Sequence, residues 1–220
     1  MMNDPRGKDA SATHGAYLAI REKILTGDLP AGQKLKIERL REMLNTGASP
    51  VREALSLLTS DLLVERIDQR GFRAAPANKA NFEEILTLRC VLEDMALRRS
   101  IERSTRTWED RLVLAHHHMT RATDQGTAAF EEAHKTFHMT LLDNASLAML
   151  ERYCSQLYDL NIRYRYLAAR GAGYRRRDVS GEHRAILDAA LEGDADRASA
   201  RLLDHYRLTG DYLVAELDDL

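Results

Sequence analysis

The segment over residues 40–72 constrains the fold most, because its pattern predicts two short helices followed at once by a β-hairpin. The first helix ends at the turn Asn45–Gly47. Ser49 is a good N-cap for the second helix, and Pro50 suits its first position, where a backbone N–H would have no partner. Two helices joined by so short a turn predict a helix-turn-helix.

The second of these helices has one apolar face and one polar face. Its apolar residues recur at the spacing of a single buried stripe and are Val51, Ala54, Leu55 and Leu58. Arg52 therefore points outward near the start of the helix. Residues 64–67 and 72–75 then predict two strands around a polar turn that contains Arg70 and Gly71. A short helix with an outward arginine fits the DNA major groove, so we expect a winged helix-turn-helix that binds DNA.

This part of the chain resembles the N-terminal winged helix of the GntR family of bacterial transcription regulators. The most specific match is Ser49–Leu55 in register with the wing glycine, Gly71. Residues 20–25 and 27–35 are similar to the family's first helix and the loop after it. The resemblance implies a regulator that acts on operator DNA.

Three positions depart from the family pattern. Ala48 and Ser49 stand where the family usually has an arginine and a threonine, and Glu38 replaces an arginine near the start of the preceding helix. We expect arginines elsewhere in the segment to compensate. The residues expected to contact DNA are Arg39, Arg41, Ser49, Arg52, Arg70 and Gly71.

The composition excludes DNA binding by bulk charge. The 220 residues carry a net charge of −2, and their 44% hydrophobic content is enough for two cores. Residues 1–76 hold 12 Lys and Arg against 10 Asp and Glu, so a local basic face is the most that this balance allows. Cys90 and Cys154 form no metal or redox motif, and no apolar run has membrane-spanning length. We therefore expect a reduced, cytoplasmic protein with no membrane partner.

Small residues and a proline near residue 76 mark the domain boundary. We expect a disordered N-terminus over 1–12, the winged helix over 13–76, a linker over 77–80 and a helical domain over 81–220. Beyond residue 80 the sequence contains no proline, and its periodicity predicts helices over 81–103, 108–125, 127–144, 146–170, 180–192 and 195–217. Short connections between amphipathic helices predict an antiparallel bundle, so the fold class is mainly α.

Histidines are the chemically informative residues of the helical domain. Of the eight in the chain, His134 and His138 are four residues apart and share one helix face. His183 and His205 lie on two later helices. Imidazoles from three helices that converge in a bundle form a site for a divalent transition metal. Spacing alone leaves open that they are ordinary surface or hydrogen-bonded histidines.

The helical domain resembles the FCD ligand-binding domain of the FadR-type branch of the GntR family. The matching pieces are residues 88–93, Phe137–His138 followed by Asn144, residues 182–187 and 193–195, and His205. Metal-binding members usually use an aspartate four residues before the Phe-His histidine, that histidine, and two later histidines. The resemblance therefore implies metal ligands at His134, His138, His183 and His205, with His134 in place of the carboxylate.

That replacement predicts which ions and effectors suit the site. Four neutral imidazoles leave a bound divalent ion with its full charge of +2, which favours an anionic effector. Nitrogen ligands favour Zn²⁺ or Ni²⁺ over the oxygen-preferring Mg²⁺ or Mn²⁺.

Arg89 is the expected partner of an effector carboxylate, because a guanidinium can hold a carboxylate in two parallel hydrogen bonds. We place it on a helix whose buried stripe contains Ile85, Leu88, Leu92 and Met95. The alternative is a surface ion pair between Arg89 and Glu93, four residues on. Further along the chain, Arg163 and Tyr164 are expected to offer additional effector contacts.

We expect a ligand-responsive bacterial transcription regulator, most simply a repressor, that binds a pseudo-palindromic operator as a homodimer. A small carboxylate bound at the metal would control it. A dedicated metal sensor with the same histidines is one alternative. A metallohydrolase is another, although Glu182, which neighbours His183, is expected to point away from the metal.

Overall fold

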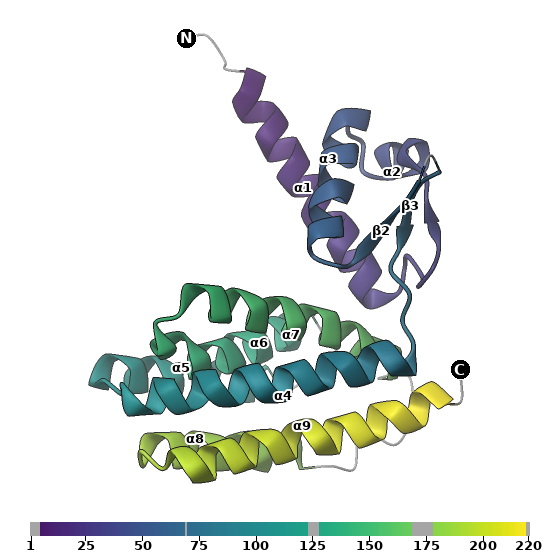
Figure 1. Cartoon of the computed structure of the whole chain (residues 1–220). Coiled ribbons are helices and arrows are strands. Elements are labelled where there is room, and N and C mark those ends of the chain that lie inside the picture. Colours follow the sequence, from purple (N-terminus) through teal and green to yellow (C-terminus); the bar gives the residue numbers. More distant parts are fainter. Residues whose placement is uncertain (1–4, 69, 123–127, 169–177, 219–220) are drawn as a thin grey trace. The chain divides into compact units, whose positions relative to one another are not determined.

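The computed structural model describes residues 5–68, 70–122, 128–168 and 178–218, and the chain divides into two compact units (Figure 1). The first, the winged-helix unit, comprises residues 1–78 together with 162–167. The second, the helical unit, comprises residues 79–161 and 168–220. The change from one unit to the next after Asn78 falls inside the expected linker.

The winged-helix unit is a three-helix core with a small sheet. Its elements, in chain order, are α1 (Pro5–Thr26), β1 (Lys34–Leu35), α2 (Ile37–Met43), α3 (Ala48–Ser60), β2 (Val64–Ile67) and β3 (Gly71–Ala74). Helix α1 packs along α3, where Ile20 and Ile24 meet a stripe that includes Val51 and Leu55, all of them fully buried. The buried residues of α3 are the four that the periodicity predicts.

Strand β3 lies between β1 and β2, and both neighbours are antiparallel to it. Leu35 pairs with Phe72, and Val64 pairs with Ala74; all four side chains are buried. The sequence predicts only the β2–β3 hairpin. Strand β1 escapes prediction because two residues are too short for an alternating pattern to show.

Two details at the helix ends differ from expectation. Helix α3 begins at Ala48, and its N-cap is Gly47, so Ser49 is not the cap. Gly47 supplies the extended backbone that a cap position needs, and Pro50 still lies in the first turn, where its missing N–H costs nothing. Helix α1 begins at Pro5, so residues 5–12 are helical rather than disordered; proline fits a first helical position. Residues 1–4 lie outside the described part of the chain.

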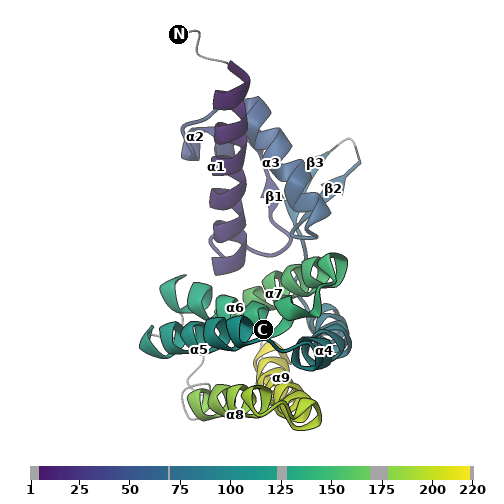
Figure 2. The same ribbon diagram turned by 90° about the vertical axis from the view of Figure 1, so that its left-hand side faces the viewer.

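The helical unit contains α4 (Lys79–Glu102), α5 (Arg106–Arg121), α6 (Ala128–Leu142), α7 (Ala148–Ala168), α8 (Val179–Leu191) and α9 (Ala195–Asp218). Residues 162–167 of α7 are the exception, because they are grouped with the winged-helix unit. A short 3-10 turn, η1 (Asp143–Ala145), follows α6. In Figure 2, α9 lies between α4 and α8. The predicted helix ends over 123–127 and 169–170 lie outside the described residues. None of the described helices is both long and apolar enough to span a membrane.

The core of the helical unit is apolar around Trp108, which is fully buried and donates its Nε1–H to the Thr140 carbonyl at 2.7 Å. Helix α4 confirms only part of the expected stripe: Ile85 is buried and Leu92 is partly buried against the core. Leu88 and Met95 are 43% and 48% exposed, whereas Arg89 and Glu93 are buried. Apolar residues lie on more than one face of α4, so its own periodicity does not decide which face turns inward.

Candidate functional site

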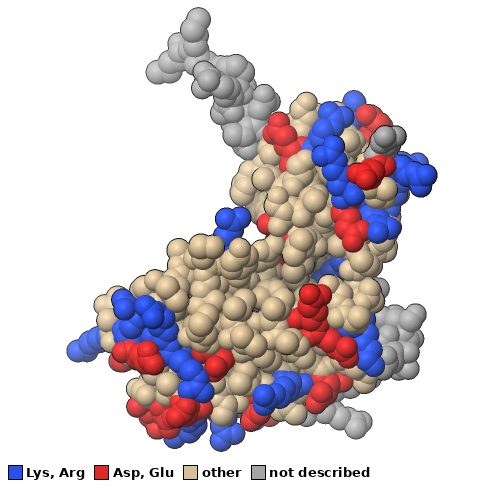
Figure 3. All heavy atoms as spheres, viewed as in Figure 1, with Lys and Arg blue, Asp and Glu red and all other residues tan. Residues whose placement is uncertain are grey.

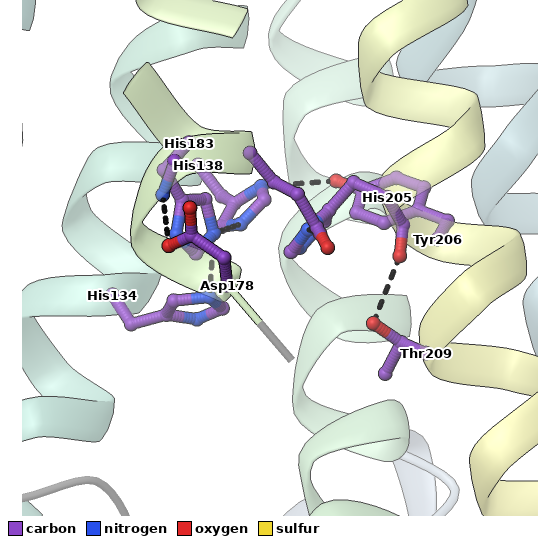
Figure 4. Close-up of polar contacts among 9 residues, drawn as sticks. His134, His138, Asp178, His183, His205, Tyr206 and Thr209 are labelled. Carbon is purple, nitrogen blue, oxygen red and sulfur yellow. Dashed lines mark hydrogen bonds and ion pairs between the residues drawn. The ribbon is translucent and has the colours of Figure 1, made fainter. Parts of the chain in front are cut away.

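Four histidines converge inside the helical unit, as the sequence predicts. His134 and His138 come from α6, His183 from α8 and His205 from α9 (Figure 4). Each offers a ring nitrogen, and these four nitrogens all lie within 4.8 Å of one another. All four side chains are buried, with 1–5% of their surface exposed.

Local helix geometry brings these rings together. The four-residue spacing on α6 places the His134 and His138 ring centroids 4.5 Å apart. Asp178 caps the start of α8 by accepting the Gly181 N–H at 2.9 Å, so that His183 enters the cluster from the first turn of that helix. The ring of His205 lies 4.5 Å from that of His183 and 5.5 Å from that of His138.

The two nitrogens of a ring have different surroundings: one faces the other histidines, and one faces residues outside the cluster. The Nε2 atom of His183 lies 3.1 Å from Nε2 of His134 and 3.2 Å from Nε2 of His138. On the outside, Nδ1 of His134 contacts the Tyr158 hydroxyl. Nδ1 of His138 lies 3.0 Å from the Tyr206 hydroxyl, and Nδ1 of His205 lies 2.7 Å from the Glu182 carboxylate. The Nε2 atoms of His134, His138 and His183 therefore face one another. A residue outside the cluster contacts the outer nitrogen of His134, His138 and His205.

This arrangement fits a transition-metal ion. Zn–N bonds of about 2.0–2.1 Å place the nitrogens of a tetrahedral site about 3.3–3.4 Å apart, close to the observed Nε2 separations. Histidines that bind metals commonly donate the other ring N–H to a hydroxyl, carbonyl or carboxylate, and the outer contacts are of this kind. An all-nitrogen donor set suits Zn²⁺ or Ni²⁺ better than Mg²⁺ or Mn²⁺.

Sequence reasoning did not identify the outer partners Tyr158 and Tyr206. It also placed Glu182 away from the site, whereas this carboxylate contacts His205. A signal existed for two of them, because Glu182 and Tyr206 are the sequence neighbours of His183 and His205. On the first turn of α8, adjacent residues can still meet different sides of one cluster.

Arg89 is buried inside the helical unit, where it contacts the carboxylate of Glu93; its expected effector role stays a prediction. Its Nε donates to Glu93 Oε1 at 2.6 Å and its Nη2 to Oε2 at 3.4 Å. The guanidinium also lies over the Tyr206 ring, 4.2 Å from its centroid. Burial opposes the charge on Arg89, but the attraction of Glu93 outweighs it and raises the pKa. The alternative ion pair is therefore present, although it is buried and not on the surface.

Arg163 and Tyr164 are grouped with the winged-helix unit, apart from the four histidines. Arg163 donates to the Pro76 carbonyl at 3.5 Å, and burial lowers its pKa. Burial raises the pKa of Tyr164. No contact described for these residues links them to the histidine cluster, so their effector role stays a prediction.

The residues expected to contact DNA are all exposed on the winged-helix unit: Arg39, Arg41, Ser49, Arg52, Arg70 and Gly71. Arg41 forms an ion pair with Glu38 at 3.2 Å, while Gly71 has a φ of +92°, a conformation that side chains disfavour. Figure 3 shows basic side chains gathered over α2 and the wing, next to acidic ones. Their contact with DNA stays a prediction.

Two family models match this chain. Residues 12–73 match the model described as "Bacterial regulatory proteins, gntR family", and residues 84–208 match the FCD domain. The chain is 34% identical over 206 residues to BphR, an uncharacterised HTH-type transcriptional regulator of Paraburkholderia xenovorans. The aligned region covers 89% of this chain and 82% of BphR. The chain is 26% identical to the HTH-type transcriptional repressor GlaR of Escherichia coli, covering 86% of this chain and 90% of GlaR.

Solved structures show the same fold. The Escherichia coli protein McbR/YncC superposes with a TM-score of 0.78 at 20% identity, covering 92% of this chain and 96% of that one. A putative GntR regulator from Rhodococcus sp. RHA1 has a TM-score of 0.74 at 18% identity, with 93% and 98% covered. The matched families and relatives are transcription regulators and not enzymes, which removes the metallohydrolase alternative. The chain belongs to the GntR family of bacterial transcription regulators and carries an FCD domain behind its winged helix.

Proposed function

We propose that this regulator is a metal-dependent repressor. Its winged helices bind a pseudo-palindromic operator as a homodimer, and its FCD domain holds Zn²⁺ or Ni²⁺ on His134, His138, His183 and His205 while responding to a small carboxylate. The observation that carries the proposal is the convergence of four buried imidazoles whose inner nitrogens lie within 4.8 Å of one another.

The charge of the site favours an anion. Neutral imidazoles do not reduce the +2 charge of a bound ion, and a buried charge needs compensation. Glu182, through His205, and Glu93, through Tyr206 and His138, supply part of it. Because Arg89 is already paired with Glu93, a carboxylate would have to compete with Glu93 for the guanidinium. The metal charge, rather than Arg89, is therefore the main attraction for the effector.

Repression and dimer formation have separate support. GlaR, one of the relatives, is itself named a repressor. For the dimer, α4 exposes a row of apolar side chains at helical spacing, Leu88, Val91 and Met95, which are 43–62% exposed. Figure 3 shows a broad uncharged area over α4. A second copy of the chain packed on this row would bury it and present two recognition helices to two half-sites.

A dedicated metal sensor is the second candidate, and one observation favours it. Four protein ligands complete a tetrahedral shell and leave no open position for an effector at the ion. In that case metal occupancy itself would control DNA binding.

One set of measurements tests both candidates. Elemental analysis of the purified protein should find about one transition-metal ion per chain, and His183→Ala should lose most of it. His118→Ala, at an exposed histidine of α5, is the matched control and should keep the metal. Wild-type protein that stays metal-free after expression with added metal would contradict the metal site.

Operator binding, measured by fluorescence anisotropy, separates the two candidates. Metal-loaded, chelator-treated and metal-restored protein are compared with and without carboxylates chosen by thermal-shift screening, since a ligand of the folded state raises its stability. A response to carboxylate in the loaded protein supports the carboxylate sensor. A response to metal alone supports the metal sensor.

A further inference from the structure

We infer that the buried Arg89–Glu93 pair sets the tautomer of His138, acting through the hydroxyl of Tyr206. This makes Arg89 and Glu93 positioning residues for the metal site. The inference deepens the proposed function, because its consequence for metal affinity rests on the four-histidine site, although the tautomer itself does not.

The first step concerns the proton of Tyr206. The carboxylate of Glu93 is fully buried, and its Oε1 accepts from Arg89 Nε at 2.6 Å. A carboxylate only accepts hydrogen bonds. The Tyr206 hydroxyl, which contacts Glu93 Oε2, must therefore donate its single hydrogen to Glu93.

The second step concerns His138. Because the Tyr206 hydrogen points to Glu93, the contact of 3.0 Å between the Tyr206 oxygen and His138 Nδ1 needs its hydrogen from the imidazole. A neutral imidazole with a hydrogen on Nδ1 has a lone pair on Nε2. That Nε2 faces Nε2 of His183 at 3.2 Å, toward the centre of the cluster. The ion pair thus makes the inner nitrogen of His138 the one that can bind a metal.

Glu182 sets the tautomer of His205 in the same way, but without a residue in between. Its carboxylate accepts directly from His205 Nδ1 at 2.7 Å, which leaves the other nitrogen of that ring as the ligand atom. Two of the four histidines are therefore oriented by carboxylates, one directly and one through a tyrosine.

The first measurement uses metal-free wild-type protein labelled with ¹⁵N-histidine. Nuclear magnetic resonance distinguishes the protonated from the unprotonated ring nitrogen. We expect His138, assigned by its loss in His138→Gln, to carry hydrogen on Nδ1. Hydrogen on Nε2 would overturn the inference, whatever the protein's affinity for metal.

The second measurement replaces the pair by apolar residues of similar size, Arg89→Met with Glu93→Leu, which avoids an unpaired buried charge. Tyr206 then has only His138 Nδ1 to donate to, so the hydrogen of His138 moves to Nε2. We expect metal affinity, measured by competition with a chelating dye, to fall by roughly 10–100-fold. The matched control is the half-exposed Asp94–Arg98 pair of the same helix, changed to Asp94→Leu with Arg98→Met, which should bind metal like the wild type.

Tyr206→Phe gives opposite results in the two backgrounds. In the wild type it removes the acceptor of His138 Nδ1 and should weaken metal binding. In the Arg89→Met, Glu93→Leu protein it removes the hydroxyl that blocks the correct tautomer and should strengthen binding. Equal metal affinity of wild type and double variant, or weakening by Tyr206→Phe in both backgrounds, would overturn the inference. A metal-free wild type would instead overturn the proposed function, and the tautomer measurement would still decide the inference.

Discussion

At the residue scale, burial and contacts divide the histidines of this chain into different roles. Three of the four in the cluster, His134, His138 and His205, are held by a partner on the outer nitrogen. His116 of α5 is also buried, but its ring lies against Phe137, with centroids 5.4 Å apart. His117 and His118, its neighbours in sequence, are exposed. One residue type thus supplies ligand, core and surface positions.

His116 should make stability depend on pH. Burial, followed by the charge of Arg184, lowers its pKa below the usual value near 6.5. The unfolded chain therefore takes up a proton at higher pH than the folded protein does, and the free energy of unfolding falls as pH falls below about 6.5. Urea unfolding of metal-free protein between about pH 7.5 and 5.5 should show a smaller loss for His116→Leu than for wild type. An identical loss in both would show that His116 is not held neutral; His118→Leu is the matched control.

Arg52 should matter for DNA binding because it is exposed on α3 while the opposite face of that helix is buried. If its guanidinium contacts a base edge, Arg52→Ala should weaken operator binding by roughly 1–3 kcal/mol. Anisotropy titrations at several salt concentrations measure this loss. Arg207→Ala removes the same charge from an exposed position of α9 and is the control. Unchanged affinity and salt dependence for Arg52→Ala would remove this residue from the interface.

At the element scale, the start of α8 is the most exacting part of the site. Asp178 accepts the Gly181 N–H, and a Cβ at residue 181 would overlap the Asp178 carboxylate. His183 lies only two residues further along the helix. Glycine at 181 therefore permits the cap that positions His183, a proposed metal ligand.

Gly181→Ala should displace this cap and lower the free energy of unfolding by about 0.5–2 kcal/mol, the usual cost of a lost N-cap. It should also weaken metal binding through His183. Urea unfolding and a metal titration measure the two effects. Gly15→Ala in α1, where a Cβ meets nothing within 4 Å, should instead stabilise the protein by about 0.5–1 kcal/mol. Gly181→Ala that matches wild type in both measurements would contradict the role of the cap.

At the scale of the whole molecule, regulation requires that the helical unit affects what the winged helix does. A metal or effector shifts operator binding only if it binds the DNA-competent and DNA-incompetent states with different affinities. A second copy of the chain is part of this expectation, because one recognition helix reads too few base pairs for a specific site.

Val91→Glu should disrupt the dimer, because Val91 is 62% exposed in the centre of the apolar row on α4 and a charge there would be buried in the interface. Light scattering after size-exclusion chromatography should find monomers, and operator affinity should fall with the loss of the second half-site. Val113→Glu, at a valine of α5 that is 46% exposed, should leave the dimer intact. A dimeric Val91→Glu protein would place the interface elsewhere.

Linkage gives a test that does not depend on any substitution. The factor by which metal or carboxylate changes operator affinity must equal the factor by which operator DNA changes the affinity for that ligand. Calorimetric titration of the ligand into free and operator-bound protein compares the two. Equal ligand affinities in both states would mean that the helical unit binds its ligand without controlling the winged helix.

The sequence by itself determined what depends on neighbours along the chain. The α3 stripe, the wing hairpin, the order of the helices and the two histidines of α6 all follow from periodicity and turn residues. The helix pattern made His183 and His205 candidates, and the family resemblance implied that they join the pair; the structure brings all four together. Periodicity and turn residues depend on neighbours along the chain, so they can be interpreted without knowing how the helices pack.

Only the tertiary structure decided which face of α4 is buried. Apolar residues on several sides of this helix let the sequence place Leu88 and Met95 inside, whereas packing against α9 buries Arg89 and Glu93. That choice brings Glu93 to Tyr206, 113 positions away in the chain, and through it to His138. Contacts between residues so far apart depend on how helices pack, and periodicity within one helix carries no information about its neighbour.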